Sequence, residues 1–223
     1  MTKLIVMLTY DDETVVKARE IFDTCKYLPV EYWGFKNIGL PKDQMKTLVK
    51  EMKAAGKTTF LEVVTLTEQS CREGAELAVE CGFDFLMGTV FHQSVLTYCK
   101  EKNLRYLPFC GQVDGHPSIL SGTPEEIAGS AAELEKAGCA GTDLLAYRHP
   151  DKPEETIRAV VKKVKFKVCV AGSVSSFDRI DLIRSINPWT FTIGTALFDG
   201  KFGPDKSFRG QLQYVVDYMN GKA

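Results

Sequence analysis

The amino-acid sequence predicts a closed eight-stranded parallel barrel of the (β/α)8, or TIM-barrel, class, built as one domain over residues 1–223. Short apolar runs rich in β-branched residues alternate eight times with amphipathic stretches, which is the pattern of successive βα units. The runs are almost continuously apolar, as expected of parallel strands that are buried on both faces. The competing fold is a doubly wound open sheet, which normally uses fewer strands.

The strands and helices can be placed along the chain in order. We expect strands at Leu4–Thr9, Val30–Phe35, Thr59–Val64, Asp84–Gly88, Arg105–Phe109, Asp143–Tyr147, Phe166–Ala171 and Thr190–Gly194. The intervening stretches place apolar side chains on one helical face, as Val15, Val16, Ala18 and Phe22 do in the first. Capping residues and prolines mark the helix boundaries. We expect starts at Asp12, Pro41, Thr67, Thr123 and Pro153, and stops at Gly56, Gly82 and Gly138.

The overall composition argues against several classes of function. A net charge of −1 does not suit a nucleic-acid surface. No apolar run reaches the ~18 residues of a membrane span, and the N-terminus lacks the long apolar core of a signal peptide. Seven cysteines without a CxxC pair are typical of reduced thiols. We therefore expect a cytoplasmic protein with no nucleic-acid partner and no membrane association.

Two glycine-bearing turns near the C-terminus carry the strongest functional signal. Gly172-Ser173 follows the seventh expected strand, Gly194-Thr195 follows the eighth, and each turn opens a helix. Glycine lets the backbone approach a ligand closely, and the N–H groups at a helix start point outward toward an anion. Because successive barrel strands end side by side, the two turns together predict a binding site for the phosphate group of a small molecule.

Charged residues within the expected strands are the first candidates for catalysis, because burying a charge is costly unless it has a partner or a ligand. Glu62 lies between large apolar residues, so strand alternation points its side chain into the barrel. Its pKa would be raised there, as in many general bases, unless a cation such as Lys36 lies nearby. Lys36 ends the second strand, where it could meet a carboxylate or a phosphate. The alternatives are a structural Glu62 and a solvated Lys36.

Arg148 and His149 follow the sixth expected strand, so both are expected at the mouth of the barrel. Arginine suits a carboxylate or a phosphate. Histidine suits proton transfer near neutral pH. Stability alone does not explain such a pair, and we include both residues among the candidates.

Five further residues are candidate substrate contacts. Asp11 ends the first strand, although a helix cap would also explain it, and Glu31 lies early in its strand, where it could belong to the bottom of the barrel. His92 is expected one turn into a helix, and Cys110 lies where a strand meets its loop. His116 belongs to the long loop that follows, of the kind that forms lids or contacts substrates. No spacing among these residues selects a metal site, so the metal stays unknown.

The two glycine turns, with their flanks, resemble those of the ribulose-phosphate-binding barrels. That group includes ribulose-phosphate epimerase, phosphoribosylanthranilate isomerase and N-acylmannosamine-6-phosphate epimerase. The resemblance implies that Gly172, Ser173, Gly194 and Thr195 donate main-chain and hydroxyl hydrogen bonds to a phosphate. It is close over the last two βα units and only architectural over the first six. The similar segments are Val170-Ala171-Gly172-Ser173-Val174, Thr192-Ile193-Gly194-Thr195-Ala196-Leu197-Phe198 and Gly200-Lys201-Phe202.

The catalytic residues of these families are not matched. The metal-dependent epimerases place His and Asp ligands on strands two, three and seven, and this chain does not. The amino-sugar isomerases use acids on strands one and five, where this chain has Thr9 and Cys110. The orotidine-decarboxylase-like members carry a DxKxxD run on strand three, where this chain reads Glu62-Val63-Val64-Thr65. The resemblance therefore carries over the phosphate site and not the catalytic set.

The leading hypothesis is an isomerase or epimerase that acts on a phosphorylated sugar or sugar acid by proton transfer next to a carbonyl. Glu62 would remove the proton, His149 or Lys36 would return one, and Arg148 or Lys36 would stabilise the enediolate oxygen.

Two alternatives stay open. One is a carbon–carbon lyase, an aldolase or a decarboxylase, that passes through an enolate. A divalent metal at Glu62 or the histidines would favour it, although the sequence requires no cofactor. The other is a non-catalytic barrel that senses a phosphorylated metabolite. A homodimer contact or a pocket could use Tyr10, Tyr32, Trp33 and Phe91, and barrel packing explains these aromatic residues equally well.

Overall fold

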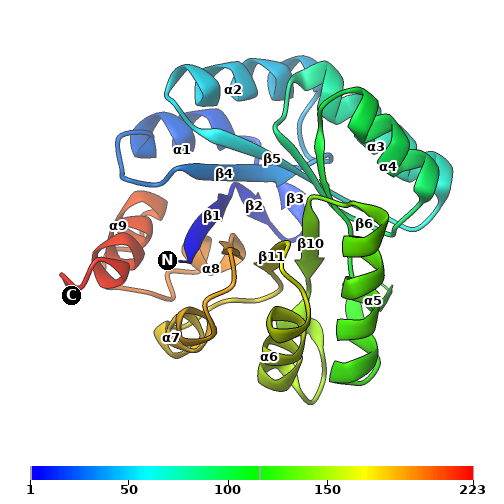
Figure 1. Cartoon of the computed structure of the whole chain (residues 1–223). Coiled ribbons are helices and arrows are strands. Elements are labelled where there is room, and N and C mark those ends of the chain that lie inside the picture. Colours follow the sequence, from blue (N-terminus) through cyan, green and yellow to red (C-terminus); the bar gives the residue numbers. More distant parts are fainter. Residues whose placement is uncertain (1, 116, 223) are drawn as a thin grey trace.

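The computed structural model describes residues 2–115 and 117–222 and has eight parallel strands surrounded by helices (Figure 1). The strands pair in the order β10-β11-β12-β1-β4-β5-β6-β7. A parallel bridge between Phe109 and Asp143 joins the two ends of this sheet, so the expected (β/α)8 fold is confirmed. The eight strands are β1 (Lys3–Met7), β4 (Tyr32–Lys36), β5 (Thr58–Thr65), β6 (Phe85–Thr89), β7 (Arg105–Leu107), β10 (Gly141–Leu144), β11 (Lys167–Val170) and β12 (Thr190–Ile193).

Helices follow the strands and form the outer ring (Figure 1). Thr67 and Thr123 cap their helices as expected, each accepting a hydrogen bond from a backbone N–H three residues on. Gly82 and Gly138 end theirs in the left-handed conformation. The helices are α1 (Ala18–Cys25), α2 (Lys42–Ala54), α3 (Glu68–Cys81), α4 (Gln93–Glu101), α5 (Pro124–Ala137), α6 (Pro153–Lys163), α7 (Phe177–Ile186), α8 (Thr195–Phe198) and α9 (Phe208–Met219), with a 3-10 turn η1 (Ala146–Arg148).

Two of the expected boundaries are wrong. The first helix begins after Lys17 rather than after Asp12, because the chain first forms an antiparallel hairpin of β2 (Thr9–Tyr10) and β3 (Glu13–Thr14). The sixth barrel strand is β10, which ends at Leu144, because the chain turns into η1 where the prediction continued the strand. His92 also differs from the prediction, since it lies at the N-cap of α4 rather than one turn inside the helix.

The apolar residues form two layers, one between the strands and the helices and one inside the barrel. Aromatic rings fill the lower interior, at the end where the strands begin. Phe60 stacks on Phe85 with 4.5 Å between ring centroids, and Trp189 lies 5.4 Å from Phe85 and 5.6 Å from Tyr32. Burying such rings stabilises this end of the barrel. Tyr32 and Trp33 are thus explained by barrel packing, since both are buried.

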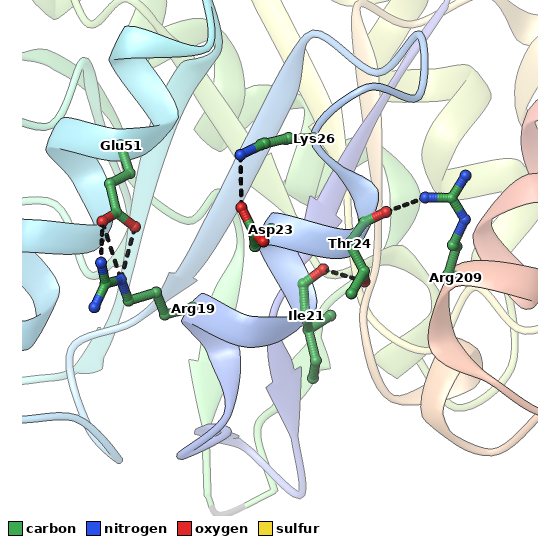
Figure 2. Close-up of polar contacts among 7 residues, drawn as sticks. All are labelled: Arg19, Ile21, Asp23, Thr24, Lys26, Glu51 and Arg209. Atoms are coloured by element: carbon green, nitrogen blue, oxygen red, sulfur yellow. Dashed lines mark hydrogen bonds and ion pairs between the residues drawn. The ribbon is translucent and has the colours of Figure 1, made fainter.

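Polar contacts fix α1 between α2 and α9, so the first helix meets the last (Figure 2). Arg19 binds both carboxylate oxygens of Glu51 on α2, with a closest approach of 2.5 Å. Arg209 on α9 donates to the carbonyl oxygen of Thr24 at the other side of α1. These contacts link the first helix to the last, so the ring of helices is closed in the same way as the ring of strands.

No helix within the described residues is long and apolar enough to span a bilayer.

Candidate active site

A cavity of about 820 Å³ opens at the end of the barrel where the strands finish. The turns after β11 and β12, η1, the ends of β4 and β5, and the β2–β3 hairpin line it. Pro117 and Ser118 reach it from a second antiparallel hairpin, β8 (Gln112–Asp114) and β9 (Ile119–Ser121), within the long loop expected to contact substrate. Active sites of TIM barrels lie at this end of the fold.

Lys36 and Glu62 lie side by side at the floor of this cavity. They are register partners on the neighbouring strands β4 and β5, and Lys36 Nζ lies 3.9 Å from Glu62 Oε1. On its other side Lys36 Nζ lies 2.7 Å from Asp12 Oδ1. Lys36 is only 7% exposed, so these charges interact in a poorly hydrated setting. Gly88 on β6 leaves room for Glu62, since a Cβ there would lie 2.9 Å from Glu62 Cγ.

Burial raises the pKa of Glu62, which is the first requirement for a carboxylate that accepts a proton near neutral pH. The positive charge of Lys36 opposes this shift, the negative charge of Asp12 adds to it, and the positive charge of Arg148 opposes it. The raising effect of burial on the pKa of Glu62 therefore exceeds the lowering effect of the neighbouring cation, Lys36.

The β2–β3 hairpin brings Asp12 to Lys36. Asp11 and Asp12 form its turn with φ of 49° and 62°, a left-handed conformation that Asp adopts more readily than most side chains. Thr14 supports the hairpin, because its hydroxyl donates to the carbonyl oxygen of Lys36 and its oxygen accepts from the Lys36 N–H. Asp11 lines the cavity as expected of a substrate contact, and neither aspartate caps a helix.

The Gly172-Ser173 turn lines the opposite wall of the cavity. Gly172 has φ +82° and Ser173 φ +58°, and a Cβ on Gly172 would lie 2.7 Å from Cγ of Arg148. Arg179 of α7 holds the turn from behind, because its guanidinium donates to the carbonyl oxygen of Ser173 and lies 4.6 Å from the centre of the Tyr147 ring. Among the described residues, no hydrogen bond accepts from the Gly172 or Ser173 N–H group.

The Gly194-Thr195 turn lies beside it, where α8 begins. A Cβ on Gly194 would lie 3.0 Å from the carbonyl oxygen of Thr9 and 3.2 Å from Met7 Cβ, so the close approach of β12 to β1 requires glycine here. Among the described residues, the N–H groups of Gly194 and Thr195 also lack a hydrogen-bond acceptor. The four residues expected to bind phosphate therefore all line one cavity.

Two cations flank these turns. Arg148 lies in η1 against Gly172, and Lys201 follows α8, its N–H bonded to the carbonyl oxygen of Ala196. Both line the cavity, and within the described part of the chain neither side chain forms an ion pair. Lys36, in contrast, already contacts Asp12 and Glu62.

The structure does not bring His149 into the cavity. Its Nδ1 accepts the backbone N–H groups of Asp151 and Lys152, which leaves Nε2 to donate to the carbonyl oxygen of Gly122 at 2.9 Å. Both ring nitrogens are thus engaged in holding the loop before α6. This corrects the expectation that His149 faces the substrate beside Arg148.

Three of the remaining candidates also lie away from the cavity. Glu31 pairs with Lys3 before β4, at the lower end of the barrel, in agreement with its structural alternative. His92 occupies the N-cap position of α4 without a side-chain capping hydrogen bond and does not line the cavity. Cys110 is completely buried in the outer apolar layer, and burial raises the pKa of its thiol to about 12, so it is a packing residue. His116 lies outside the described residues.

Asp143 is the charged residue that the sequence analysis passed over. It lies within β10, has no exposed surface, and among the described residues neither carboxylate oxygen has a hydrogen-bond partner. The sequence feature that could have identified Asp143 is an acidic residue inside an apolar strand, which is the feature that identified Glu62. The shifted boundary of the sixth strand had placed Asp143 at its start instead of its centre.

Within residues 2–115 and 117–222, no group of three or more His, Cys, Asp or Glu side chains has metal-binding geometry. Asp12 and Glu62, the acids nearest the cavity floor, lie on either side of Lys36 instead of converging on a common point.

No family model and no curated protein matches this chain, whereas solved structures match its fold. Orotidine 5'-phosphate decarboxylase from Pyrococcus horikoshii OT3 superposes with a TM-score of 0.72, covering 98% of this chain and 99% of that one at 12% identity. N-(5'-phosphoribosyl)anthranilate isomerase from Pyrococcus furiosus gives 0.68, covering 99% and 100% at 13% identity.

A regulatory protein has the same fold. The glycerol uptake operon antiterminator regulatory protein from Listeria monocytogenes str. 4b F2365 gives a TM-score of 0.60, covering 89% of this chain and 95% of that one at 14% identity. One barrel architecture thus serves a decarboxylase, an isomerase and a regulator, so activity must be argued from the site. The resemblance to the ribulose-phosphate-binding barrels is confirmed at the level of the fold.

Proposed function

We propose that this protein is an enzyme that transfers a proton next to the carbonyl group of a phosphorylated sugar or sugar acid, as an isomerase or epimerase does. The observation that carries the proposal is the pairing of Glu62 with Lys36 at the floor of a cavity whose wall holds the glycine turns after β11 and β12. A base and an adjacent cation are what proton abstraction beside a carbonyl requires.

In this proposal the phosphate binds at the Gly172 and Gly194 turns. Free backbone N–H groups and the Ser173 and Thr195 hydroxyls supply its hydrogen bonds, and Arg148 and Lys201 supply the opposite charge. No carboxylate in the described part of the chain forms an ion pair with these two cations. Phosphate can therefore bind them without breaking an existing ion pair. The bound phosphate directs the other end of the substrate toward the cavity floor.

Glu62 then removes a proton from the carbon next to the carbonyl group. Its raised pKa makes it a stronger base than an ordinary glutamate. As the carbonyl oxygen becomes negative, Lys36 Nζ donates a hydrogen bond to it, a role that charge in a poorly hydrated site performs well. In an isomerisation Glu62 returns the proton to the former carbonyl carbon, while the hydroxyl hydrogen on the carbon that lost the proton passes to the former carbonyl oxygen. In an epimerisation a separate donor, a role open to Lys36, protonates the other face of the same carbon. His149 has no part, because both its ring nitrogens are engaged elsewhere.

The test is solvent deuterium incorporation into a panel of pentose and hexose phosphates and their sugar acids, preceded by a thermal-shift screen of the same panel. We expect a compound that stabilises the fold more than inorganic phosphate does and gains deuterium beside its carbonyl. Incorporation should vanish in Glu62→Gln. A panel in which nothing binds better than inorganic phosphate would contradict the proposal.

The same assay separates the alternatives. A lyase that passes through an enolate would use the same base and cation, and it would release a carbon fragment that product analysis detects. A regulatory barrel would be stabilised by a ligand without deuterium exchange or turnover.

A further inference from the structure

Asp143 lies at one end of a row of three inward-facing residues inside the barrel. It pairs in register with Cys169 on β11, which in turn pairs with Thr190 on β12, and Cys169 belongs to the apolar layer of the interior. Neighbouring residues of parallel strands point to the same side of the sheet, so all three side chains face inward. Asp143, Thr190 and Cys169 are each completely buried. Among the described residues, Thr190 Oγ1 also lacks a hydrogen-bond partner.

Charged and titratable groups from several strands face Asp143. Glu62 on β5 repels its negative form and Lys36 on β4 attracts it. Cys169 on β11 and Cys110, just after β7, also interact with it electrostatically, and burial keeps both of these thiols protonated. The charges that influence the protonation of Asp143 are therefore those of Glu62, the proposed base, and Lys36, its neighbouring cation.

We propose that Asp143 and Glu62 form one carboxyl pair, in which Asp143 keeps a proton as a neutral acid beneath the cavity while Glu62 carries the charge at its floor. Asp143 is a positioning residue in this arrangement, since it does not line the cavity and acts on the substrate only through Glu62.

The surroundings decide which member of the pair holds the proton. Glu62 lies 3.9 Å from the Lys36 ammonium and reaches the cavity. Within the described part of the chain Asp143 has no hydrogen-bond donor, and it has no exposed surface, so an ionised carboxylate there is strongly unfavourable. Burial raises the pKa of Asp143 well above its usual range, and the nearby charge of Glu62 raises it further. Two carboxylates that interact in a poorly hydrated interior do not both ionise readily.

The pair has a consequence for catalysis that rests on the proposed function. A neutral Asp143 adds no further anion to the Asp12 carboxylate that already opposes ionisation of Glu62, so Glu62 can ionise and act as a base near neutral pH. An ionised Asp143 would raise the pKa of Glu62 until it no longer released its proton. The protonation of Asp143 itself does not depend on which substrate the enzyme uses.

Infrared difference spectroscopy of the full-length protein tests that protonation directly. We expect the carbonyl stretch of a protonated carboxylic acid in the wild type at pH 7, and its loss in Asp143→Asn. In Glu62→Gln the band should titrate at a lower pH than in the wild type, because the repelling charge is gone. Asp151→Asn, an exposed aspartate, is the matched control and should keep the band. Absence of the band from the wild type, or its persistence in Asp143→Asn, would overturn the proposal.

Thermal unfolding against pH gives a second measurement without any need for activity. An acid whose pKa is raised by folding stabilises the fold below its unfolded pKa of ~3.9, and that contribution is lost as the pH rises through the folded pKa. The melting temperature of Asp143→Asn relative to the wild type should therefore increase steadily from pH 5 to pH 8. A constant difference over this range would contradict a protonated Asp143. Either result stands whether or not a sugar phosphate is ever found to bind.

Discussion

The two ends of the barrel use charge in opposite ways. At the lower end, Glu31 pairs with Lys3, while Asp84 accepts hydrogen bonds from Thr59 and contacts Lys53 at 3.0 Å. Just inside, stacked aromatic rings fill the interior, with the Arg105 guanidinium 4.0 Å from the centre of the Phe85 ring.

The upper end leaves polar groups unmatched. Lys36 is shared between two carboxylates, and within the described residues Arg148 and Lys201 have no ion-pair partner and Asp143 has no hydrogen-bond donor. Natural proteins satisfy buried polar groups unless function requires otherwise. Under the proposed function, the lower end provides stability and the upper end provides the chemistry, and substitutions matched between the two ends test this division.

The largest expected effect is on stability, from Phe60→Ala at the lower end. Phe60 is fully buried and contacts three aromatic rings, so its removal should reduce the free energy of unfolding by about 3–5 kcal/mol. Urea denaturation measures this loss. Tyr27→Ala, at a side chain 83% exposed, should change it by less than about 0.5 kcal/mol. Similar losses for both would mean that the aromatic stack does not support the barrel.

Glu62→Gln at the upper end should abolish activity while sparing the fold. Loss of a general base lowers kcat by roughly 10²–10⁴-fold, measured as deuterium incorporation into the substrate that the panel identifies. Glu31→Gln is the matched glutamate at the lower end and should keep kcat near the wild-type value. Equal loss in the two variants would remove the distinction between the ends.

Gly172→Ala should weaken phosphate binding in addition to straining the backbone. Gly172 has φ +82° and its new Cβ would lie 2.7 Å from Arg148 Cγ, whereas Gly56 has φ +73° and open space around it. Both alanine variants should lose about 1–2 kcal/mol of stability from the left-handed backbone. Only Gly172→Ala should lower the affinity for inorganic phosphate, by roughly tenfold or more, in calorimetric titration. Reduced affinity in Gly56→Ala as well would point to a general loss of folding.

The smallest expected effect is a shift of the pH profile in Arg148→Gln. Burial raises the pKa of Glu62, and the Arg148 charge is one of those that lower it. Removing that charge should raise the pKa further, so the acidic limb of kcat moves to higher pH because Glu62 accepts a proton only when ionised. Arg158→Gln, on the outer helix α6 where Arg158 pairs with Glu154, should leave the limb unchanged. A shift toward lower pH would contradict the proposed role of Glu62.

The sequence predicted the barrel and the positions of the two glycine turns because both depend on local patterns. Apolar runs mark the strands, and Gly172 and Gly194 mark places where backbone or side chain approaches within 3.0 Å of a would-be Cβ. The same patterns misplaced the first helix, since Val16 has helical spacing but is 81% exposed. Two consecutive aspartates with left-handed φ, Asp11 and Asp12, form a hairpin turn in that segment, and the ion pair of Asp12 with Lys36 depends on contacts across the fold.

The candidate catalytic set was harder to predict, because it depends on where side chains point. Alternation along β5 placed Glu62 correctly beside Lys36. His149 was expected beside Arg148 because the two are adjacent in sequence, yet its ring caps the turn before α6. Asp143 was missed because its importance lies in its surroundings, a dry interior in which the described residues provide no hydrogen-bond donor, and no local pattern indicates that.

The most direct test of the central claim is an amide NMR titration of the wild type with inorganic phosphate. Binding at the upper end predicts saturable shifts for the amides of Gly172, Ser173, Gly194 and Thr195, and none for those of Glu31 and Asp84 at the lower end. If the amides of the two glycine turns do not move at saturating phosphate, or if the shifts lie at the lower end, the assignment of phosphate binding to this cavity is wrong.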